Sequence, residues 1–243
     1  MKISGLNWYL EASRTSVVGY LLFMAFLCSL GFWQLDRAEQ KKLILLQQQS
    51  QQDLSDVNLN STEVIEFNDL FYRKAFAMGH YDKTHQFLLD NQIVDGKNGY
   101  FVLTPFFLDA QQRAVLVNRG WVALGDDRGK LPAIEIQTQP AHINGRIHAF
   151  PGVGFKLKGA EIPTDNWPSV VQVINNEVLG KKLGYELLPF LIQLESASEE
   201  GYKREWKSNP IITPEKHVGY AVQWFALALT LTALFIRISF KKQ

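Results

Sequence analysis

One histidine of this chain lies at the start of a long run that contains no charged residue. His217 is followed by residues 218–236, which hold only apolar, aromatic and uncharged polar side chains. A Thr-Pro-Glu sequence shortly before the histidine is a typical helix start, which places His217 about one turn inside the predicted helix. Tyr220 and Trp224 follow at helical spacing, so an imidazole and two aromatic rings share one stripe of this helix.

An imidazole in this position could do two kinds of chemistry. It could form a structural hydrogen bond at the membrane interface, where water still reaches it, and this is the more common use. It could also bind haem iron in a slot between two helices walled by aromatic rings. Small Ala221 and Ala228 on the same stripe would let a flat group or another helix approach closely. The residues alone leave both uses open.

Trp33 and Arg37 form a second group of interest, near the other end of the chain. They lie in the sequence GFWQLDRAEQKK, at the end of another uncharged run. On a helix, a separation of four residues suits either a plain anchor at the membrane interface or a cation–π pair.

The two uncharged runs are long enough to cross a membrane. Residues 15–35 and 218–236 are 21 and 19 residues without a charge. As helices they would span about 31 Å and about 28 Å at roughly 1.5 Å per residue, which matches a hydrocarbon core about 30 Å thick. A cleaved signal peptide is disfavoured, because the first run is too long and no small-x-small pair follows it. The single cysteine, Cys28, lies in this run, so no disulfide is expected.

The short tails predict the orientation of the two helices. They carry five basic residues against one acidic residue, Glu11: Lys2, Arg14, Arg237, Lys241 and Lys242. The positive-inside rule therefore places both termini in the cytoplasm. The helices are then expected to span a bacterial inner (plasma) membrane, with the segment between them in the periplasm. Trp33 and His217 would lie at the same membrane face and at a similar depth.

This arrangement predicts six segments along the chain. They are a cytoplasmic tail (1–14), a transmembrane helix (15–35), a helical stalk (36–57), a periplasmic β-rich domain (58–212), a second transmembrane helix (213–236) and a second cytoplasmic tail (237–243).

The central segment shows the pattern of short strands joined by turns. Seven runs are predicted strands: KAFAMGHY, HQFLLDNQIV, GYFVLTPFFL, AVLVNRGWVAL, HINGRIHAF, SVVQVI and LPFLIQL. Short links such as Asp95-Gly96 favour antiparallel pairing, and residues 175–184 are a predicted helix. The expected fold is an α+β membrane protein, in which two transmembrane helices flank an antiparallel sheet or partial barrel with one or two helices.

The sequence VNRGWV within this segment has two interpretations. In the first it is a sheet edge, with Gly120 at a bulge, Trp121 packed and Arg119 paired at the rim. In the second it is a docking surface for a partner. Motifs of common enzymes (G-x-S-x-G, H-E-x-x-H, C-x-x-C and a Walker loop) are missing from the chain. A binding protein is therefore expected rather than an enzyme such as an envelope hydrolase, and no nucleic-acid partner is expected.

Five stretches together resemble the surfeit locus protein 1 family of cytochrome c oxidase assembly factors: LGFWQLDRAEQK, GHYD, GYFVLTPF, VLVNRGWV and HVGYAVQWFALA. They cover both uncharged runs and much of the segment between, so the resemblance is specific. It implies a two-helix membrane protein that assists haem a insertion into oxidase subunit I by binding or handing over haem a.

The resemblance also implies candidate site residues and partners. Some bacterial members look like haem a carriers that use the histidine corresponding to His217, so His217 is the candidate ligand of the haem iron. Tyr220, Trp224 and Trp33 would line the haem, and Arg37 would meet its propionates. The implied partners are oxidase subunit I, haem a synthase or other oxidase assembly factors, and membrane lipid. The alternative is a scaffold that stabilises an oxidase assembly intermediate without binding haem.

Overall fold

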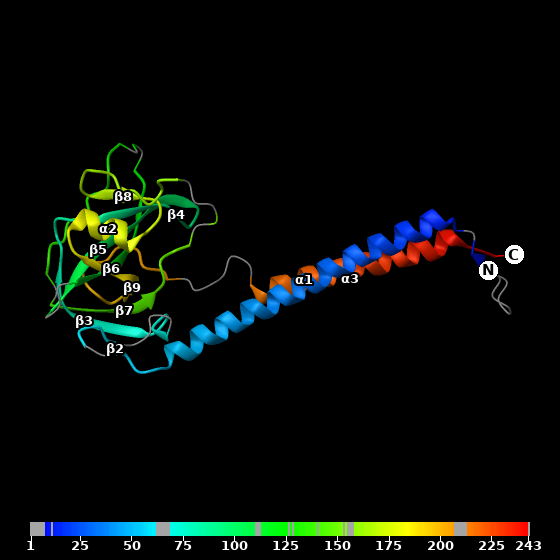
Figure 1. Cartoon of the computed structure of the whole chain (residues 1–243), viewed down its shortest axis with the longest axis horizontal. Helices are drawn as coiled ribbons and strands as arrows, with labels where there is room; N and C mark the ends of the chain where they lie inside the picture. The colour runs from blue at the N-terminus through cyan, green and yellow to red at the C-terminus, as the bar shows by residue number, and fades with distance from the viewer. Residues whose placement is uncertain are drawn as a thin grey trace. The chain divides into compact units, whose positions relative to one another are not determined.

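The computed structural model separates the chain into two compact units, residues 1–47 with 208–243 and residues 48–207. Figure 1 shows the first unit as a pair of long helices and the second as a β-rich domain. The residues that the structure describes are 8–10, 12–61, 69–109, 113–125, 127, 129–139, 141–152, 154, 158–206 and 213–242.

The helical unit is formed by α1 (Arg14–Gln52) and α3 (Pro214–Ser239), which lie side by side in Figure 1. Both helices are long and apolar enough to cross a membrane, as the uncharged runs predict. The strands that flank them, β1 (Trp8–Leu10) and β10 (Phe240–Lys242), pair antiparallel. α1 continues without a break through the predicted stalk as far as Gln52.

Small residues allow the two helices to pack closely. Gly31 of α1 lies against the ring of Phe225, and a Cβ at this glycine would lie 2.6 Å from the ring atom Cζ. Ala221 and Ala228 of α3 are buried, as their predicted role in close approach requires.

A polar contact and a ring stack join the helices nearer the termini. The hydroxyl groups of Tyr20 in α1 and Thr232 in α3 lie 3.0 Å apart. The ring of Tyr20 also stacks on Phe235, with 4.3 Å between the centroids. The helix pair is therefore held by specific contacts along its length.

Among its described residues, the second unit contains one eight-stranded sheet and one helix: β2 (Val57–Asn58), β3 (Lys74–Tyr81), β4 (Phe87–Val94), β5 (Lys97–Leu108), β6 (Arg113–Ala123), β7 (His142–His148), β8 (Ser169–Val171), α2 (Asn176–Leu183) and β9 (Glu186–Leu194). The strand order is β2-β3-β7-β9-β6-β5-β4-β8, and an additional pairing of β3 with β5 closes β3, β7, β9, β6 and β5 into a barrel. The predicted barrel between two apolar helices is confirmed.

The sheet is mixed, whereas the short links predicted an antiparallel one. The pairs β6–β9, β4–β8 and β2–β3 run parallel. Parallel pairing needs a long crossover connection. The chain between β6 and β9 supplies one, because it contains β7, β8 and α2 before it returns to the barrel.

Local sequence explains the turns and the helix of this domain. Asp95 and Gly96 join β4 to β5 with φ values of 50° and 74°, the left-handed geometry that a two-residue hairpin needs. The predicted helix forms as α2, where the side chain of Asn175 accepts hydrogen bonds from the backbone of Glu177 and Val178. Gly184 ends α2 with a φ of 82°.

The barrel interior is filled by side chains that alternate along the strands. In β3 the buried residues are every second one, Ala75, Ala77 and Tyr81 among them. They belong to a cluster with apolar residues of the other barrel strands, including Phe106, Val117, Ile143, Ile147, Phe190 and Ile192. The barrel is thus a packed core, which can act on other molecules only through its surface and its ends.

Candidate functional site

His217 is the fourth residue of α3 and is buried in the helix pair, with 8% of its surface exposed. Its ring atom Nδ1 lies 2.7 Å from the side-chain oxygen Oε1 of Gln34 in α1. The helix start works as predicted, since the hydroxyl of Thr213 accepts a long hydrogen bond of 3.5 Å from the backbone N–H of Lys216. This start places the imidazole against α1.

The second predicted group lies on α1 at the same level. Trp33 directly precedes Gln34, so it shares the level of His217 along the helix pair. The guanidinium carbon of Arg37 lies 5.7 Å from the centre of the Trp33 ring, which is the cation–π pair that the sequence offered beside a plain interfacial anchor. Arg37 also donates a hydrogen bond of 2.9 Å to the side chain of Gln40. Trp33 is 49% exposed, so much of its surface remains available to lipid or a ligand.

The predicted stripe on α3 divides between two environments. His217, Ala221 and Ala228 are buried, and Trp224 is half-buried. Tyr220 is 45% exposed and lies on the outer surface of the helix. The structure therefore brings His217 together with Gln34, next to Trp33, and leaves Tyr220 facing outward.

Gln34 was missed by the sequence analysis, although a signal was present. It is a hydrogen-bonding amide at the end of an otherwise apolar run, beside the tryptophan that was predicted to lie level with His217. A polar side chain at that depth calls for a partner, because an unpaired amide in an apolar environment is costly. The imidazole was the candidate partner at the same level.

The position of Arg119 in the barrel domain differs from the one that the sequence predicted. The interpretation of VNRGWV as a sheet edge with Arg119 at the rim is wrong, because β6 lies inside the sheet between β5 and β9. The side chain of Arg119 is only 1% exposed. The uninterrupted apolar residues around it, AVLV and WVAL, are typical of a central strand. Two details of that interpretation are confirmed: Trp121 is buried, and the β5–β6 register shifts beside Gly120.

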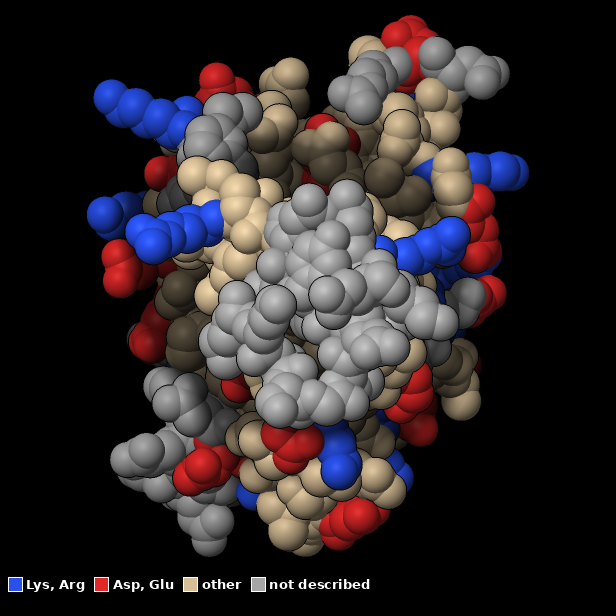
Figure 2. Space-filling view, turned by 90° about the vertical axis from the view of Figure 1, so that its right-hand side faces the viewer, with Lys and Arg blue, Asp and Glu red and all other residues tan. Residues whose placement is uncertain are grey.

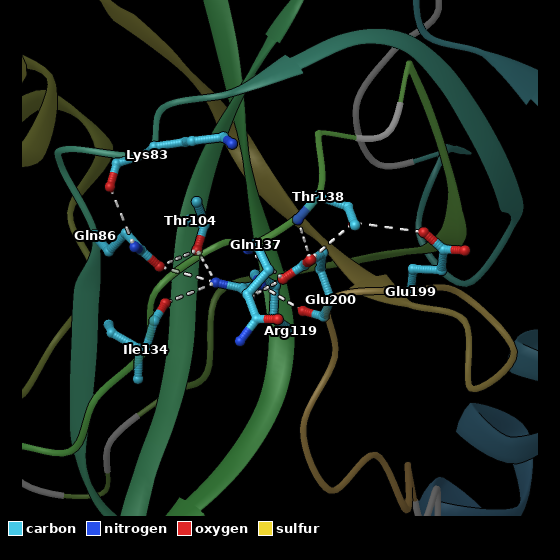
Figure 3. Close-up of polar contacts among 9 residues, drawn as sticks. All are labelled: Lys83, Gln86, Thr104, Arg119, Ile134, Gln137, Thr138, Glu199 and Glu200. Atoms are coloured by element: carbon cyan, nitrogen blue, oxygen red, sulfur yellow. Dashed lines mark hydrogen bonds and ion pairs between the residues drawn. The ribbon is translucent and has the colours of Figure 1, made fainter.

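The buried guanidinium of Arg119 has partners on several sides (Figure 3). It donates to the backbone oxygen of Glu200 at 2.6 Å and to the side-chain oxygen of Gln86 at 2.9 Å. Longer contacts reach the hydroxyl of Thr104, the carbonyl of Ile134 and the carboxylate of Glu200. The charge is therefore paired and hydrogen-bonded, as a buried cation must be.

Glu200 links this network to a neighbouring segment. Its carboxylate accepts hydrogen bonds from the backbone and hydroxyl of Thr138 and from the backbone of Gln137. Burial opposes ionisation, but these hydrogen bonds and the charge of Arg119 hold the pKa of Glu200 below its ordinary value. Arg119 and Glu200 thus fasten two loops to the barrel, which is a structural role.

A second polar cluster surrounds Asp82, in the GHYD sequence. Its carboxylate accepts hydrogen bonds from the ring of His85 at 2.8 Å, the hydroxyl of Thr84 at 2.7 Å and the hydroxyl of Tyr185 at 2.9 Å. Burial acts to raise the pKa of Asp82, but the hydrogen bonds from Thr84, His85 and Tyr185 outweigh it and lower that pKa. Asp82 organises the turn after β3 and connects it to the start of β9.

The charged side chains that Figure 2 shows in colour are mixed in sign. In Figure 2, Lys and Arg side chains are interspersed with Asp and Glu, and among the residues drawn in colour neither sign gathers into one large patch on this face. The net charge of the whole chain is +1 at pH 7.

The fold defines a class of protein: a β-barrel domain inserted between two helices that can each span a membrane. The chain belongs to the SURF1 family, whose model matches residues 21–229. This confirms the resemblance seen in the five sequence stretches. The match includes both His217 and Gln34.

Named relatives come from bacteria and from eukaryotes. A SURF1-like protein of Rickettsia conorii is 29% identical over 234 residues, which cover 89% of each chain. Surfeit locus protein 1 of Xenopus tropicalis is 22% identical over 252 residues, covering 96% of this chain and 79% of the relative. Cytochrome oxidase assembly protein SHY1 of Saccharomyces cerevisiae is 27% identical over 95 residues, covering 39% of this chain and 24% of the yeast protein.

Proposed function

We propose that this chain is an assembly factor for cytochrome c oxidase, and that it binds haem a at the α1–α3 helix pair and hands it to subunit I. Membership of the SURF1 family and the name of the yeast relative, a cytochrome oxidase assembly protein, support the assembly role. One observation carries the haem-binding part: His217 is held against α1 by a hydrogen bond through one ring nitrogen.

The residues present fit an axial haem ligand. A histidine that binds a metal through one ring nitrogen commonly donates the other N–H to an oxygen acceptor, and Gln34 supplies that oxygen to Nδ1. His217 would hold the iron of haem a, and the rings of Trp33, Trp224 and Tyr220 would contact the macrocycle or its tail. The guanidinium of Arg37, on the exposed face of α1, would bind a propionate. Bound haem a supplies the iron centre that the oxidase uses for electron transfer and oxygen chemistry.

The membrane orientation is part of the proposal. Both helices would span a bacterial inner membrane, with the two basic tails in the cytoplasm and the barrel in the periplasm. Pairing of β1 with β10 at the ends of the helices supports a common location for both tails. An alkaline phosphatase fusion within the barrel should be active and one after Gln243 inactive; activity at the C-terminus would contradict this orientation.

A scaffold that binds no haem is the second candidate function. The same hydrogen bond favours it, because an imidazole that joins two helices through an amide is also a structural contact. In that case the helix pair would anchor the barrel, and the barrel surface would stabilise an oxidase assembly intermediate. The two candidates share the oxidase and the membrane as partners and differ in whether haem a binds.

The assembly role is tested in cells that lack this protein. We expect oxidase subunits to be present but activity to be low, with less haem a per oxidase complex than in wild-type cells. Complementation by the wild-type chain should restore both. Normal haem content and activity in the deletion strain would remove the assembly role. An absorbance spectrum of the protein purified from cells that make haem a then separates the haem carrier from the scaffold.

A further inference from the structure

The hydrogen bond between Gln34 and His217 determines where the imidazole carries its proton. The atom of Gln34 that faces Nδ1 is the amide oxygen, at 2.7 Å, and an amide oxygen can only accept. Nδ1 must therefore be the protonated nitrogen of the neutral ring. The lone pair is then on Nε2, the nitrogen on the far side of the imidazole.

Nε2 is placed differently from Nδ1. In the part of the chain that the structure describes, no hydrogen bond to Nε2 is present, and Nε2 is not among the fully buried atoms that lack a partner. The residue as a whole is buried, with 8% of its surface exposed. One ring nitrogen, Nδ1, is held by a hydrogen bond, and the other, Nε2, has none among the described residues.

We propose that Gln34 is a positioning residue that fixes His217 in the Nδ1–H tautomer and so presents the Nε2 lone pair as the ligand for haem iron. The free side chain of histidine prefers its proton on Nε2, which would block that nitrogen as a ligand. The amide of Gln34 reverses this preference and also fixes the orientation of the ring. This inference rests on the proposed function for its ligand, but the tautomer itself is a property of the chain alone.

The local geometry explains why a glutamine performs this role. Gln34 is part of α1, where backbone hydrogen bonds and the packing of neighbouring Gly31 against Phe225 fix the rotation of the helix. His217 is fixed in the same way by its place between the α3 start and buried Ala221. A neutral amide adds no charge at this position, so the acceptor does not have to be balanced by a cation.

The first experiment measures the tautomer without haem. Full-length protein with 15N-labelled histidine is prepared in lipid nanodiscs, and the His217 signals are assigned by their loss in His217→Ala. At a pH where the ring is neutral, we expect the wild type to show protonated Nδ1 and unprotonated Nε2. Gln34→Leu should shift the population towards the Nε2–H form. A wild-type ring protonated on Nε2, or a tautomer unchanged by Gln34→Leu, would overturn the proposal.

Matched variants separate positioning from a general structural effect. Gln223→Leu makes the same chemical change at an exposed position of α3 and should leave the tautomer unchanged. Gln34→Glu keeps an oxygen acceptor and should retain the Nδ1–H form, which a role based only on side-chain packing does not predict. Helix content measured by circular dichroism should be equal in all of these proteins.

The second experiment adds haem a to the same purified proteins and measures affinity and reduction potential. We expect Gln34→Leu to bind about 10- to 100-fold more weakly, as for other partners of metal-binding histidines. Gln34→Glu should bind near wild-type strength with a lower potential, because a carboxylate makes the imidazole a stronger donor. Equal affinity for the wild type and Gln34→Leu would refute the positioning role. If the wild type binds no haem a, the proposed function fails, and the tautomer experiment still decides what Gln34 does.

Discussion

The barrel and the helix pair each contain a buried polar side chain, but the two side chains differ in how fully they are hydrogen-bonded. In the barrel, Arg119 is surrounded by acceptors just before β4, on β5 and in two loops, and its charge is balanced by Glu200. In the helix pair, His217 has one hydrogen bond, from Nδ1 to Gln34, and no hydrogen bond to Nε2 is present among the described residues. A group whose hydrogen bonds are all satisfied stabilises a fold, whereas a group that is oriented and left partly open is suited to binding.

The barrel and the helix pair are therefore expected to have different roles, one in folding and the other in ligand binding. The barrel core is closed by apolar side chains and by the Arg119 network, so changes there should affect folding first. The helix pair has small residues, aromatic rings and one oriented imidazole, so changes there should affect ligand binding first.

The largest expected effect is the loss of Arg119. Arg119→Met removes the charge and leaves Gln86 and Glu200 without their partner in a buried site, so we expect a loss of about 3–5 kcal/mol in the free energy of unfolding. Urea unfolding of the full-length protein in detergent micelles, followed by tryptophan fluorescence, measures it. The control is Lys74→Met on β3, at an exposed position; it should change stability by less than about 0.5 kcal/mol. Equal effects of the two substitutions would show that the network does not stabilise the barrel.

A backbone effect of intermediate size is expected beside this network. Gly120 has a φ of 116°, and a Cβ there would lie 2.8 Å from the backbone oxygen of Lys203. Gly120→Ala should therefore cost about 1–3 kcal/mol in unfolding free energy. Gly125→Ala is the matched control, because a Cβ at Gly125 meets nothing within 4 Å. A stable Gly120→Ala protein would mean that this bulge adapts easily and does not constrain the chain.

The smallest effect concerns acid stability and Asp82. Its pKa is lower in the folded chain than its ordinary value, because hydrogen bonds from Thr84, His85 and Tyr185 outweigh the effect of burial. The ionised carboxylate therefore favours folding above the ordinary pKa of about 4, and this contribution is lost as pH falls through the folded-state pKa.

We expect Asp82→Asn to be less stable than the wild type at neutral pH and to lose less stability on acidification. Urea midpoints measured at several pH values from neutral to acidic should show this flatter dependence. Asp53→Asn, at an exposed position after α1, should keep the wild-type slope. An unchanged slope in Asp82→Asn would indicate that the cluster contributes nothing to the pH dependence, and that it comes from other carboxylates with a lowered pKa, such as Glu200.

Features that depend on local sequence were predicted well. Alternating apolar residues located the strand Lys74–Tyr81 with its observed ends, and Asp95-Gly96 located the hairpin. The helix start and the level of Trp33 relative to His217 followed from caps and from charge-free length. The strand, the hairpin and the helix start depend on a few neighbouring residues, and the level of Trp33 relative to His217 depends on the length of helix that a membrane requires.

Features that depend on contacts between distant segments were not predicted. Parallel pairing of β6 with β9 brings together residues more than 70 positions apart, such as Arg113 and Glu186, and no local pattern encodes it. Arg119 was placed at a rim because an arginine is rarely buried; only the long-range acceptors from Gln86 and Glu200 make burial possible. The contact of Gln34 with His217 depends on the rotation of both helices about their axes, which the level alone does not determine.

The most direct test of the central claim is the haem a content of His217→Ala, purified from cells that make haem a. Alanine removes the ligand and keeps the helix, so the protein should accumulate in the membrane as the wild type does. We predict that it co-purifies with far less haem a, while Trp224→Leu, which keeps the imidazole, loses less. A His217→Ala protein with the haem content and Soret position of the wild type would contradict the account, and the scaffold function would then be the better explanation of this chain.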